Sequence, residues 1–554
     1  MDIEAVEKIF DDRYASTRFA SRNKDKSKWL LLTFSEDYIL ILWNMSKSLH
    51  RVSVMADSQK YSIKFGLARI ESELVSQSVD LQVIITKAEY NDSKAFLEAG
   101  EEFTAANRIC LLVHAGLYSY RFADSVFELA ATQYWGVAGY SALEMTPLER
   151  TDREFFFEFV MSSLGRPPKT KFYDSLKDQC QVSDIGIITY EFSSALCLSL
   201  ADKVPPFKQS IPDDWIFPWG SGAVAKKLLW ALMIRCFFHL LTIRKAAHFY
   251  SVNGGGLESL CLLTDEATLS LELAKISMLE VTDALSFVRA LSLGEATRAN
   301  DPALQPFIKL SDGRLLIGCL NVLTNKQDRN LLSLHARVSK GSFDSQSSIF
   351  EKLMIQRIED VAKARKFNYK KNYHIPGARE VGDLDVIFCD ARSKTLLICE
   401  LRWILQPGDA REVMLKAKAC NDKVPKIALK AVKAKEKIED LLARFDVKQA
   451  APNEWAVCGL VVIEGYAGIK SCDDAYPIIP MGIFLEGLNI FTRLDRLYAW
   501  AKSLKWLPQE NKHFTSETVS TDLGEFKVNR PGFANMTLAR PLLSHVKESA
   551  KKMK

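Results

Sequence analysis

The first two-thirds of the chain combine short apolar runs with longer stretches in which apolar residues recur at helical spacing. The run YILILW (38–43) is typical of a strand, whereas 103–139 and 267–293 place apolar residues on one helical face and predict helices. At 307–320 an Asp-Gly pair separates two apolar runs, which predicts a hairpin. The pattern therefore indicates a mixed and increasingly helical N-terminal region.

The C-terminal third has a clearer order of elements. A serine precedes an amphipathic stretch, and a Pro-Gly pair and a polar turn separate the strand-like runs that follow. The predicted elements are a helix at 347–367, strands at 369–375, 384–390 and 395–403, a helical region at 409–445, strands at 456–466 and 478–488, and a helix at 491–504. We expect an α/β sandwich, followed by a frayed lysine-rich tail at 545–554.

A chain of 554 residues is too long for one core. The predicted fold class is multidomain α+β, in which a mixed and helical N-terminal region precedes an α/β domain with a mixed sheet flanked by helices. The expected domains are a mixed α/β domain at 1–165, a mainly helical domain at 166–345 that ends in the hairpin, the α/β domain at 346–506, and a C-terminal extension with a basic tail at 507–554.

Composition narrows the class of protein only modestly. The chain is 48% hydrophobic and 25% charged with a net charge of +5, so a nucleic-acid partner is permitted but not required. The eleven cysteines include no CxxC pair, which predicts reduced thiols rather than disulfides or a zinc site. The N-terminus lacks a signal-peptide pattern, and the most apolar run, 228–243, contains Arg235 and His239 and is too short to cross a bilayer. We therefore expect a cytoplasmic protein with no membrane partner.

Two carboxylates interrupt the apolar strands of the α/β domain, in GDLDVIFCDARSKTLLICELRW (382–403). Side chains alternate along a strand, so Glu400 and Arg402 share a face, and Asp385 of the paired strand can approach Glu400. A buried charge costs several kcal/mol unless it is paired or bound to a metal. Either Asp385 forms a salt bridge with Arg402 and Glu400 one with another cation, with no metal, or the two acids, with Glu351 of the preceding helix, hold a divalent cation such as Mg²⁺.

These residues resemble the motif of the PD-(D/E)xK nuclease superfamily, whose members have the restriction-endonuclease-like fold. The family pattern reads G-E-x-D-hydrophobic, a hairpin and E-x-K, and this chain has GDLDVI (382–387) and, fifteen residues after the second aspartate, ELR (400–402). The resemblance covers the α/β domain alone. It implies an αβββαβ core, phosphodiester hydrolysis with Mg²⁺ (or Mn²⁺), and DNA or RNA as substrate. It also implies that Asp385 and Glu400 bind the metal and that Glu351, which matches an acid of the first helix, assists.

Arg402 stands where the family has a lysine. Arginine stays protonated and cannot act as a general base, although it can orient a scissile phosphate or stabilise developing negative charge. Three explanations remain open. The metal ion alone suffices, a lysine of the following helix (Lys416 or Lys418) takes the position, or the site has lost activity.

A basic stripe is predicted in the helical region after the hairpin, because lysines recur there at spacings of three and four, at Lys423, Lys426, Lys430, Lys433 and Lys437. The stripe is either a solvated surface or a binding surface for nucleic-acid phosphates, whose affinity would fall steeply with salt. His374, just before the Pro-Gly turn, is either a structural residue or a contact to substrate.

The sequence favours a metal-dependent nuclease in which Asp385, Glu400 and Arg402 act at the phosphodiester, with DNA favoured over RNA. A role in genome defence, such as antiviral defence, is expected by analogy with similar fusions. One alternative is a catalytically inactive nuclease-fold protein that acts as a nucleic-acid-binding or assembly scaffold. Another is a helical assembly factor whose strand acids are salt-bridged. The N-terminal region would provide contacts to a protein partner or to a second copy of the chain.

Overall fold

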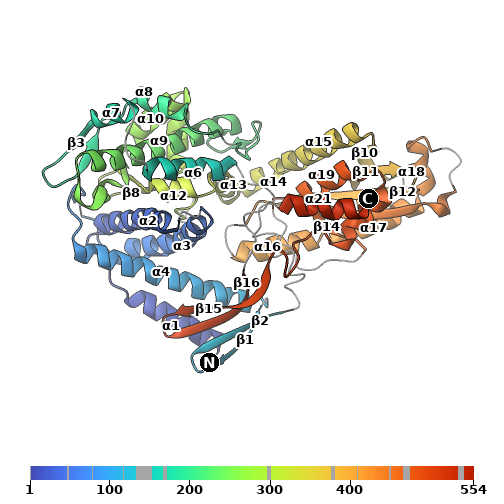
Figure 1. Ribbon diagram of the computed structural model, residues 1–554, viewed down its shortest axis with the longest axis horizontal. Helices are drawn as coiled ribbons and strands as arrows, with labels where there is room; N and C mark the ends of the chain where they lie inside the picture. Colours follow the sequence, from blue (N-terminus) through green and yellow to red (C-terminus); the bar gives the residue numbers. More distant parts are fainter. Residues whose placement is uncertain are drawn as a thin grey trace. The chain divides into compact units, whose positions relative to one another are not determined.

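The computed structural model describes residues 2–46, 49–77, 79–116, 118–132, 152–165, 171–206, 208–295, 301–375, 381–407, 410–447, 451–465, 475–534 and 542–554. The chain forms two compact units, each built from two segments (Figure 1). Unit 1 comprises Met1–Asn107 and Thr151–Gln346, and unit 2 comprises Arg108–Arg150 and Ser347–Lys554. The end of unit 1 lies at the predicted boundary near 345. The other predicted ranges are regrouped, because 108–150 and 507–554 both belong with the C-terminal α/β region.

Unit 1 is mainly helical and carries small sheets. Its helices are α1 (Ile3–Ser16), α2 (Lys24–Ser46), α3 (Leu49–Glu73), most of α4 (Lys87–His114), α6 (Asp152–Gly165), α7 (Lys171–Lys177), α8 (Ser194–Ala201), α9 (Gly222–Phe249), α10 (Glu266–Ser277), α11 (Val281–Ala290), α12 (Cys319–Thr324), α13 (Gln327–Val338) and α14 (Lys340–Gln346). Its strands pair as β3 (Cys180–Val182) with β4 (Ile188–Tyr190), as β5 (Ile216–Phe217) with β6 (Gly220–Ser221), and as β7 (Leu262–Thr264), β9 (Leu315–Ile317) and β8 (Phe307–Lys309) in one sheet.

Helix α9 lies at the buried centre of unit 1, as its apolar run predicted. Arg235 and His239, which interrupt that apolar run, both have hydrogen-bond partners. Arg235 Nε donates to Glu272 Oε2 at 2.6 Å, and Arg235 Nη1 donates to the Tyr190 hydroxyl at 2.7 Å. That hydroxyl lies 2.9 Å from His239 Nδ1. The buried charge of Arg235 is therefore neutralised within the unit. None of the described helices is both long and apolar enough to span a bilayer.

Two local predictions for the N-terminal region have opposite outcomes. The hairpin at 307–320 is confirmed, since β8 and β9 are antiparallel and Gly313 adopts a φ of +86° in their turn. The strand predicted at 38–43 is wrong, because this run lies in α2. Helix α2 is buried along much of its length, and a helix that is apolar on most sides has no face from which the helical period can be read.

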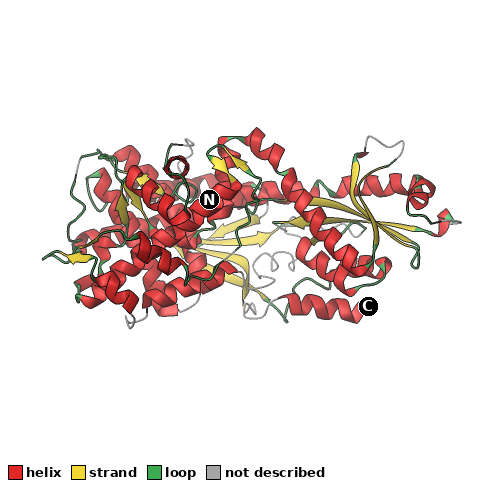
Figure 2. Cartoon of the chain, turned by 90° about the horizontal axis from the view of Figure 1, so that it is seen from above, coloured by secondary structure: helices red, strands yellow, loops and turns green. Residues whose placement is uncertain are grey.

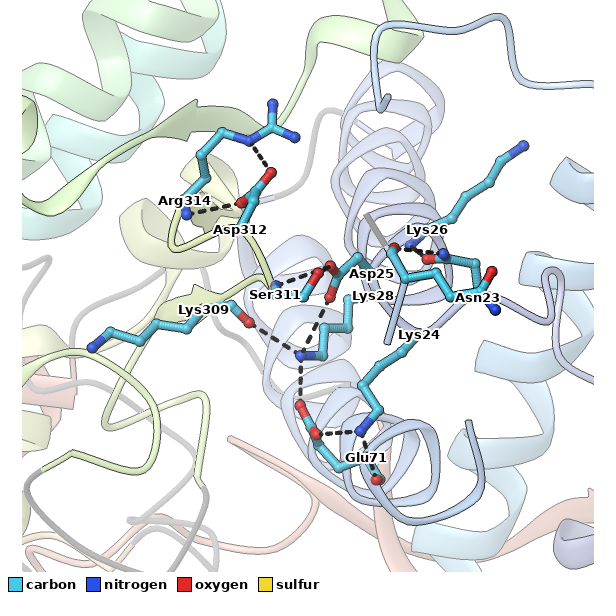
Figure 3. Close-up of polar contacts among 11 residues, drawn as sticks. Asn23, Lys24, Asp25, Lys26, Lys28, Glu71, Lys309, Ser311, Asp312 and Arg314 are labelled. Atoms are coloured by element: carbon cyan, nitrogen blue, oxygen red, sulfur yellow. Dashed lines mark hydrogen bonds and ion pairs between the residues drawn. The ribbon is translucent and has the colours of Figure 1, made fainter. Parts of the chain in front are cut away.

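A polar cluster joins α2 to α3 and to the hairpin (Figure 3). Lys28 Nζ lies 2.5 Å from a carboxylate oxygen of Glu71 and donates to the carbonyl oxygen of Lys309 at 3.1 Å. Asp25, one turn before Lys28, accepts a hydrogen bond from the Ser311 N–H at 2.9 Å. Because Lys28 is almost fully buried, each of its contacts replaces hydration that was lost on folding.

Unit 2 contains a five-stranded mixed sheet with helices on both sides of the strands (Figure 2). The helices are α15 (Ser348–Arg365), α16 (Ala410–Asn421), α17 (Val424–Glu436), α18 (Ile438–Arg444), α19 (Met481–Ile490), α20 (Leu494–Ser503) and α21 (Leu542–Met553). The strand order is β10 (Asn368–His374), β11 (Asp383–Asp390), β12 (Thr395–Trp403), β13 (Ala456–Glu464) and β14 (Ile478–Pro480). Neighbours are antiparallel from β10 to β12 and parallel from β12 to β14.

Helices α15 and α17 cover opposite faces of this sheet. Trp403 of β12 stacks on Phe350 of α15 with ring centroids 3.8 Å apart. Ile427 of α17 lies against Gly459 of β13, where a Cβ would come within 2.8 Å of its side chain. Gly459 is paired with Ile398, and side chains alternate along β12, so Ile398 and Trp403 point to different faces. The face that carries Ile398 and Glu400 is therefore the one that α17 covers.

Two elements of unit 2 differ from the prediction. The strand predicted at 478–488 ends at Pro480, which is the N-cap of α19, because a short apolar run fits a buried helix as well as a strand. The lysine-rich tail predicted to be frayed is helix α21. Val546 and Ala550 recur on one of its faces and are buried in the core, and Ser549 accepts a hydrogen bond from the Trp500 indole at 3.0 Å.

A second sheet in unit 2 joins strands from distant parts of the chain, in the order β1 (Tyr118–Ala123), β2 (Val126–Ala131), β16 (Phe526–Ala534) and β15 (Thr515–Leu523). The helix predicted at 103–139 is therefore wrong at 118–131, which form β1 and β2, while 133–139 lie outside the described residues. Strands β2 and β16 are parallel, and Phe127 of β2 packs against Phe526 of β16 with ring centroids 5.8 Å apart.

We expect Glu272→Gln to destabilise unit 1 by about 3–5 kcal/mol, because Arg235 would keep a buried charge without its carboxylate. Glu266→Gln is the matched control, since Glu266 and Arg289 form an ion pair at the same 2.6 Å but Arg289 is 60% exposed. This control should cost about 0–1 kcal/mol. Denaturant unfolding of the full chain measures both, and equal effects of the two variants would contradict the prediction.

Candidate active site

Asp385 and Glu400 face each other on neighbouring antiparallel strands. The paired register of β11 and β12 ends with Val386 and Cys399, and its continuation by one position places Asp385 opposite Glu400. Directly opposed residues point to the same face of a sheet. Asp385 Oδ2 also accepts a hydrogen bond from the Leu401 N–H at 2.7 Å, so its carboxylate is tied to β12 beside Glu400. The structure thus brings together the two strand acids that the sequence singled out.

Two lysines of the following helical region neutralise Glu400. Lys423 Nζ lies 2.6 Å from Oε1, and Lys430 Nζ lies 2.5 Å from Oε2. The lysines are seven residues apart, which places them two turns apart on the same side of the helix. Glu400 is only 3% exposed, and Lys430 is 6% exposed. Lys430 also donates to the main-chain carbonyl of Asp383. A buried carboxylate is therefore held between two ammonium groups.

The two acids have opposite pKa shifts. Burial, and then the nearby charge of Glu400, raise the pKa of Asp385 to about 6. Burial alone would also raise the pKa of Glu400, but the charges and hydrogen bonds of Lys423 and Lys430 outweigh it and leave that pKa lowered. Glu400 is therefore ionised throughout the neutral range, whereas Asp385 exchanges a proton near pH 6. Divergent pKa values in adjacent carboxyl groups are typical of functional sites.

Arg402 and Glu351 form a pair of their own. Arg402 Nη1 lies 3.1 Å from Glu351 Oε1, and the two side chains are 42% and 33% exposed. Glu351 belongs to α15, which covers the sheet face opposite to Glu400, and it meets Arg402 near the end of β12 instead of joining the strand acids. The structure therefore does not bring the three predicted acids together. It also does not contain the alternative salt bridge between Asp385 and Arg402, because Arg402 pairs with Glu351 among the described residues, whereas Glu400 does pair with other cations.

The predicted lysine stripe is divided between two roles. Lys423 and Lys430 point to Glu400, so the prediction of one continuous solvated or phosphate-binding face is corrected for these two residues. Lys426 and Lys437 are exposed, and Lys433 pairs with Glu436 at 2.9 Å. The sequence named Lys416 or Lys418 as the lysine that serves the strand acids, whereas the structure brings Lys423 and Lys430 there. The sequence signal for this arrangement was an acid inside an apolar strand, followed by two lysines seven residues apart in the next helical region.

A histidine–aspartate pair lies at the rim of the same site. His374, the last residue of β10, is directly opposite Asp383, the first residue of β11. His374 Nδ1 contacts Asp383 Oδ1, and the two side chains are 57% and 49% exposed. The sequence pointed to His374 alone and not to its partner, because a turn confined to Pro376-Gly377 would not place Asp383 opposite His374. The turn residues 376–380 lie outside the described part of the chain.

The donor set fits a hard divalent cation. Mg²⁺ takes oxygen ligands, commonly from one or two carboxylates, and keeps several waters. Asp385 and Glu400 supply such oxygens, and among the described residues no hydrogen bond involves Oδ1 of Asp385. Both oxygens of Glu400 contact lysines, so cation binding would require at least one lysine to move aside. Across the described ranges, no group of three or more His, Cys, Asp or Glu side chains is arranged to hold a metal. The fit therefore rests on two acids.

Comparison of the chain with protein-family models, with curated proteins and with solved structures gave no match.

We expect Glu400→Gln to destabilise unit 2 by about 3–5 kcal/mol, because it leaves the buried Lys430 and the adjacent Lys423 facing no carboxylate. Lys430→Met should cost distinctly less, since Glu400 keeps Lys423. Lys433→Met, at the exposed pair with Glu436, is the control and should cost about 0–1 kcal/mol. Denaturant unfolding checks the order of the three values. A cost for Lys430→Met equal to that of Glu400→Gln would show that Lys423 does not compensate.

We expect Asp385→Asn to become more stable relative to the parent chain as the pH rises from 4 to 7. The folded-state pKa of Asp385 is raised, so its favourable contribution is complete below the unfolded-state pKa and is lost as the pH passes about 6. The relative gain should reach about 2–3 kcal/mol. Unfolding of both chains at several pH values measures it. Asp390→Asn is the control, because the pKa of Asp390 is lowered and its difference from the parent should stay constant above pH 5.

Proposed function

We propose that unit 2 is a metal-dependent nuclease domain that hydrolyses phosphodiester bonds in nucleic acids, with DNA favoured over RNA. The observation that carries the proposal is the opposition of Asp385 and Glu400 on β11 and β12, with two lysines at Glu400. Further support comes from the order of elements. A helix, three antiparallel strands, a helical region and a strand parallel to β12 correspond to the αβββαβ core that the PD-(D/E)xK resemblance implies.

In this proposal Asp385 and Glu400 hold Mg²⁺ or Mn²⁺. When bound, such an ion polarises the phosphodiester and lowers the pKa of a coordinated water. The protein's part is to keep both carboxylates ionised at one point of a largely buried strand pair. Because the pKa of Asp385 is raised to about 6, cation binding competes with a proton at Asp385 and strengthens as the pH rises through that value.

Lys430 takes the role that the family gives to the lysine of E-x-K. It reaches Glu400 from α17 instead of from β12, and the position of Arg402 is thereby released to pair with Glu351. An ammonium group held beside the reacting phosphate stabilises the negative charge that develops during attack. The exposed Lys426 and Lys437 would contact phosphates of the flanking nucleotides. In this proposal the family's lysine is replaced by Lys430 of α17, so the presence of arginine at position 402 does not mean that the ammonium group is missing.

One observation favours a second candidate, a nuclease-fold protein that binds nucleic acid without cleaving it. Both carboxylate oxygens of Glu400 already have a lysine partner, and a site that is self-neutralised in this way is stable without a cation. Such a protein would retain salt-sensitive binding through its lysines, because binding to phosphates releases counterions. The two candidates differ in a single measurable property, which is cleavage.

The test is a cleavage assay of the purified full chain on supercoiled plasmid, single-stranded DNA and RNA, with Mg²⁺ or Mn²⁺ and with chelator. Asp385→Asn is the decisive variant, because it removes a metal-binding oxygen and is expected to gain stability relative to the parent as the pH rises to neutral. It should lower the cleavage rate more than about 100-fold, since even residues behind a metal ligand contribute 10–100-fold. Lys430→Met should also lose activity. Lys394→Met is the control, because Lys394 lies in the turn at the far end of the same hairpin.

Three outcomes separate the candidates. Metal-dependent cleavage that is lost in Asp385→Asn and kept in Lys394→Met supports the nuclease. Salt-sensitive binding of a labelled oligonucleotide without cleavage in either metal supports the second candidate. Absence of binding even at low salt contradicts both and leaves the assembly factor with salt-bridged strand acids.

A further inference from the structure

The exposed pair of His374 and Asp383 is linked to the strand acids through the sheet. Asp383 and Asp385 are two residues apart on β11, so their side chains share a face and are about 7 Å apart along the strand. Lys430 connects the two sites directly, because its ammonium group contacts both the carbonyl oxygen of Asp383 and the carboxylate of Glu400. The imidazole therefore lies on the face of the sheet where the proposed hydrolysis takes place, one strand further out.

The imidazole of His374 is exposed and contacts a carboxylate, which distinguishes it from the buried histidines of the described chain. His239, His335 and His545 are buried, and each has a ring nitrogen bonded within the protein core. His374 is 57% exposed, with Nδ1 held by Asp383. Within the described residues no hydrogen bond involves its Nε2. A carboxylate at Nδ1 fixes the orientation of the ring, while the second nitrogen is available to substrate.

From this geometry we infer that His374 is the proton donor to the leaving group, with Asp383 as its positioning residue. The inference rests on the proposed function. Attack of water on phosphorus forms one P–O bond and releases a proton to solvent. The bond to the bridging oxygen breaks, its electron pair stays on that oxygen, and the Nε2 proton of His374 converts the oxygen to a hydroxyl. The neutral imidazole then takes a proton from solvent, and Asp383 keeps the ring in place through its contact with Nδ1.

The position of His374 suits a proton donor to the leaving group better than it suits a general base. Asp385, Glu400 and Lys430 gather at one point and activate the attacking side, where a cation and a developing anion have to be stabilised. In an in-line displacement the leaving oxygen lies on the far side of phosphorus from the attacking one. His374 is displaced from the acids towards the edge strand β10, which is where a donor to the far side is needed.

The test uses a substrate in which the leaving bridging oxygen is replaced by sulfur, after end analysis of the products has shown which bridging oxygen leaves. A thiolate departs without protonation, because thiols are far more acidic than alcohols. For His374→Gln we expect the cleavage rate to fall about 10²–10⁴-fold on the oxygen substrate, the usual contribution of general acid catalysis. On the sulfur substrate, with Mn²⁺ as the metal, the rate should stay within about tenfold of the parent. Asp383→Asn should show the same pattern with a smaller loss.

Asp385→Asn is the matched control, because it should slow both substrates alike. Equal losses on both substrates in His374→Gln, or no loss on either, would overturn the role of His374 and leave the proposed function intact. A parent chain that cleaves neither substrate would overturn both proposals. The exposed positions of His374 and Asp383 make unfolding of these variants an improbable cause of lost activity, and their unfolding midpoints check this directly.

Discussion

The architecture of unit 2 depends on how one buried carboxylate is neutralised. Glu400 lies inside a strand that is otherwise apolar, and it is compensated by Lys423 and Lys430. For both ammonium groups to reach it, α17 has to cross the sheet closely and in a fixed rotation. Gly459 of β13 permits that approach, because any side chain there would collide with Ile427. One electrostatic requirement therefore fixes the position of a helix, the choice of a glycine and the location of the site.

The same arrangement makes solvent exposure increase from Glu400 to His374 along one end of the sheet. Glu400 is buried and its pKa is lowered, Asp385 is partly buried and its pKa is raised to about 6, and the pair of Asp383 and His374 is exposed. Charges on the buried side chains interact strongly because water screens them little, whereas the exposed side chains are in direct contact with solvent. A polyanionic substrate that meets this end of the sheet would find electrostatic stabilisation and proton transfer on adjacent strands.

Some features of the candidate site and of the fold of unit 2 could be predicted from the sequence, and others could not, for physical reasons that differ between them. The opposition of Asp385 and Glu400 could be predicted because a short turn sets the register of the two strands and alternation sets the face. The lysines that reach Glu400 could not, because that depends on how α17 is rotated over the sheet, which no local pattern encodes. Glu351 was assigned to the wrong face for a similar reason. The run at 478–488 was ambiguous because a buried helix and a buried strand are both uniformly apolar.

The parallel pairing of β2 with β16 has a consequence for how the protein is made. Glu128 accepts a hydrogen bond from Asn529, a residue that follows it by 401 positions. During translation, β2 therefore leaves the ribosome long before its neighbour exists, and one strand edge remains open while the rest of unit 1 and most of unit 2 are synthesised. Open strand edges are the surfaces through which nascent chains associate wrongly. Slow elongation lengthens that exposure, so yield of folded protein should depend on the speed of synthesis and on chaperones that shield Phe127 and Leu129.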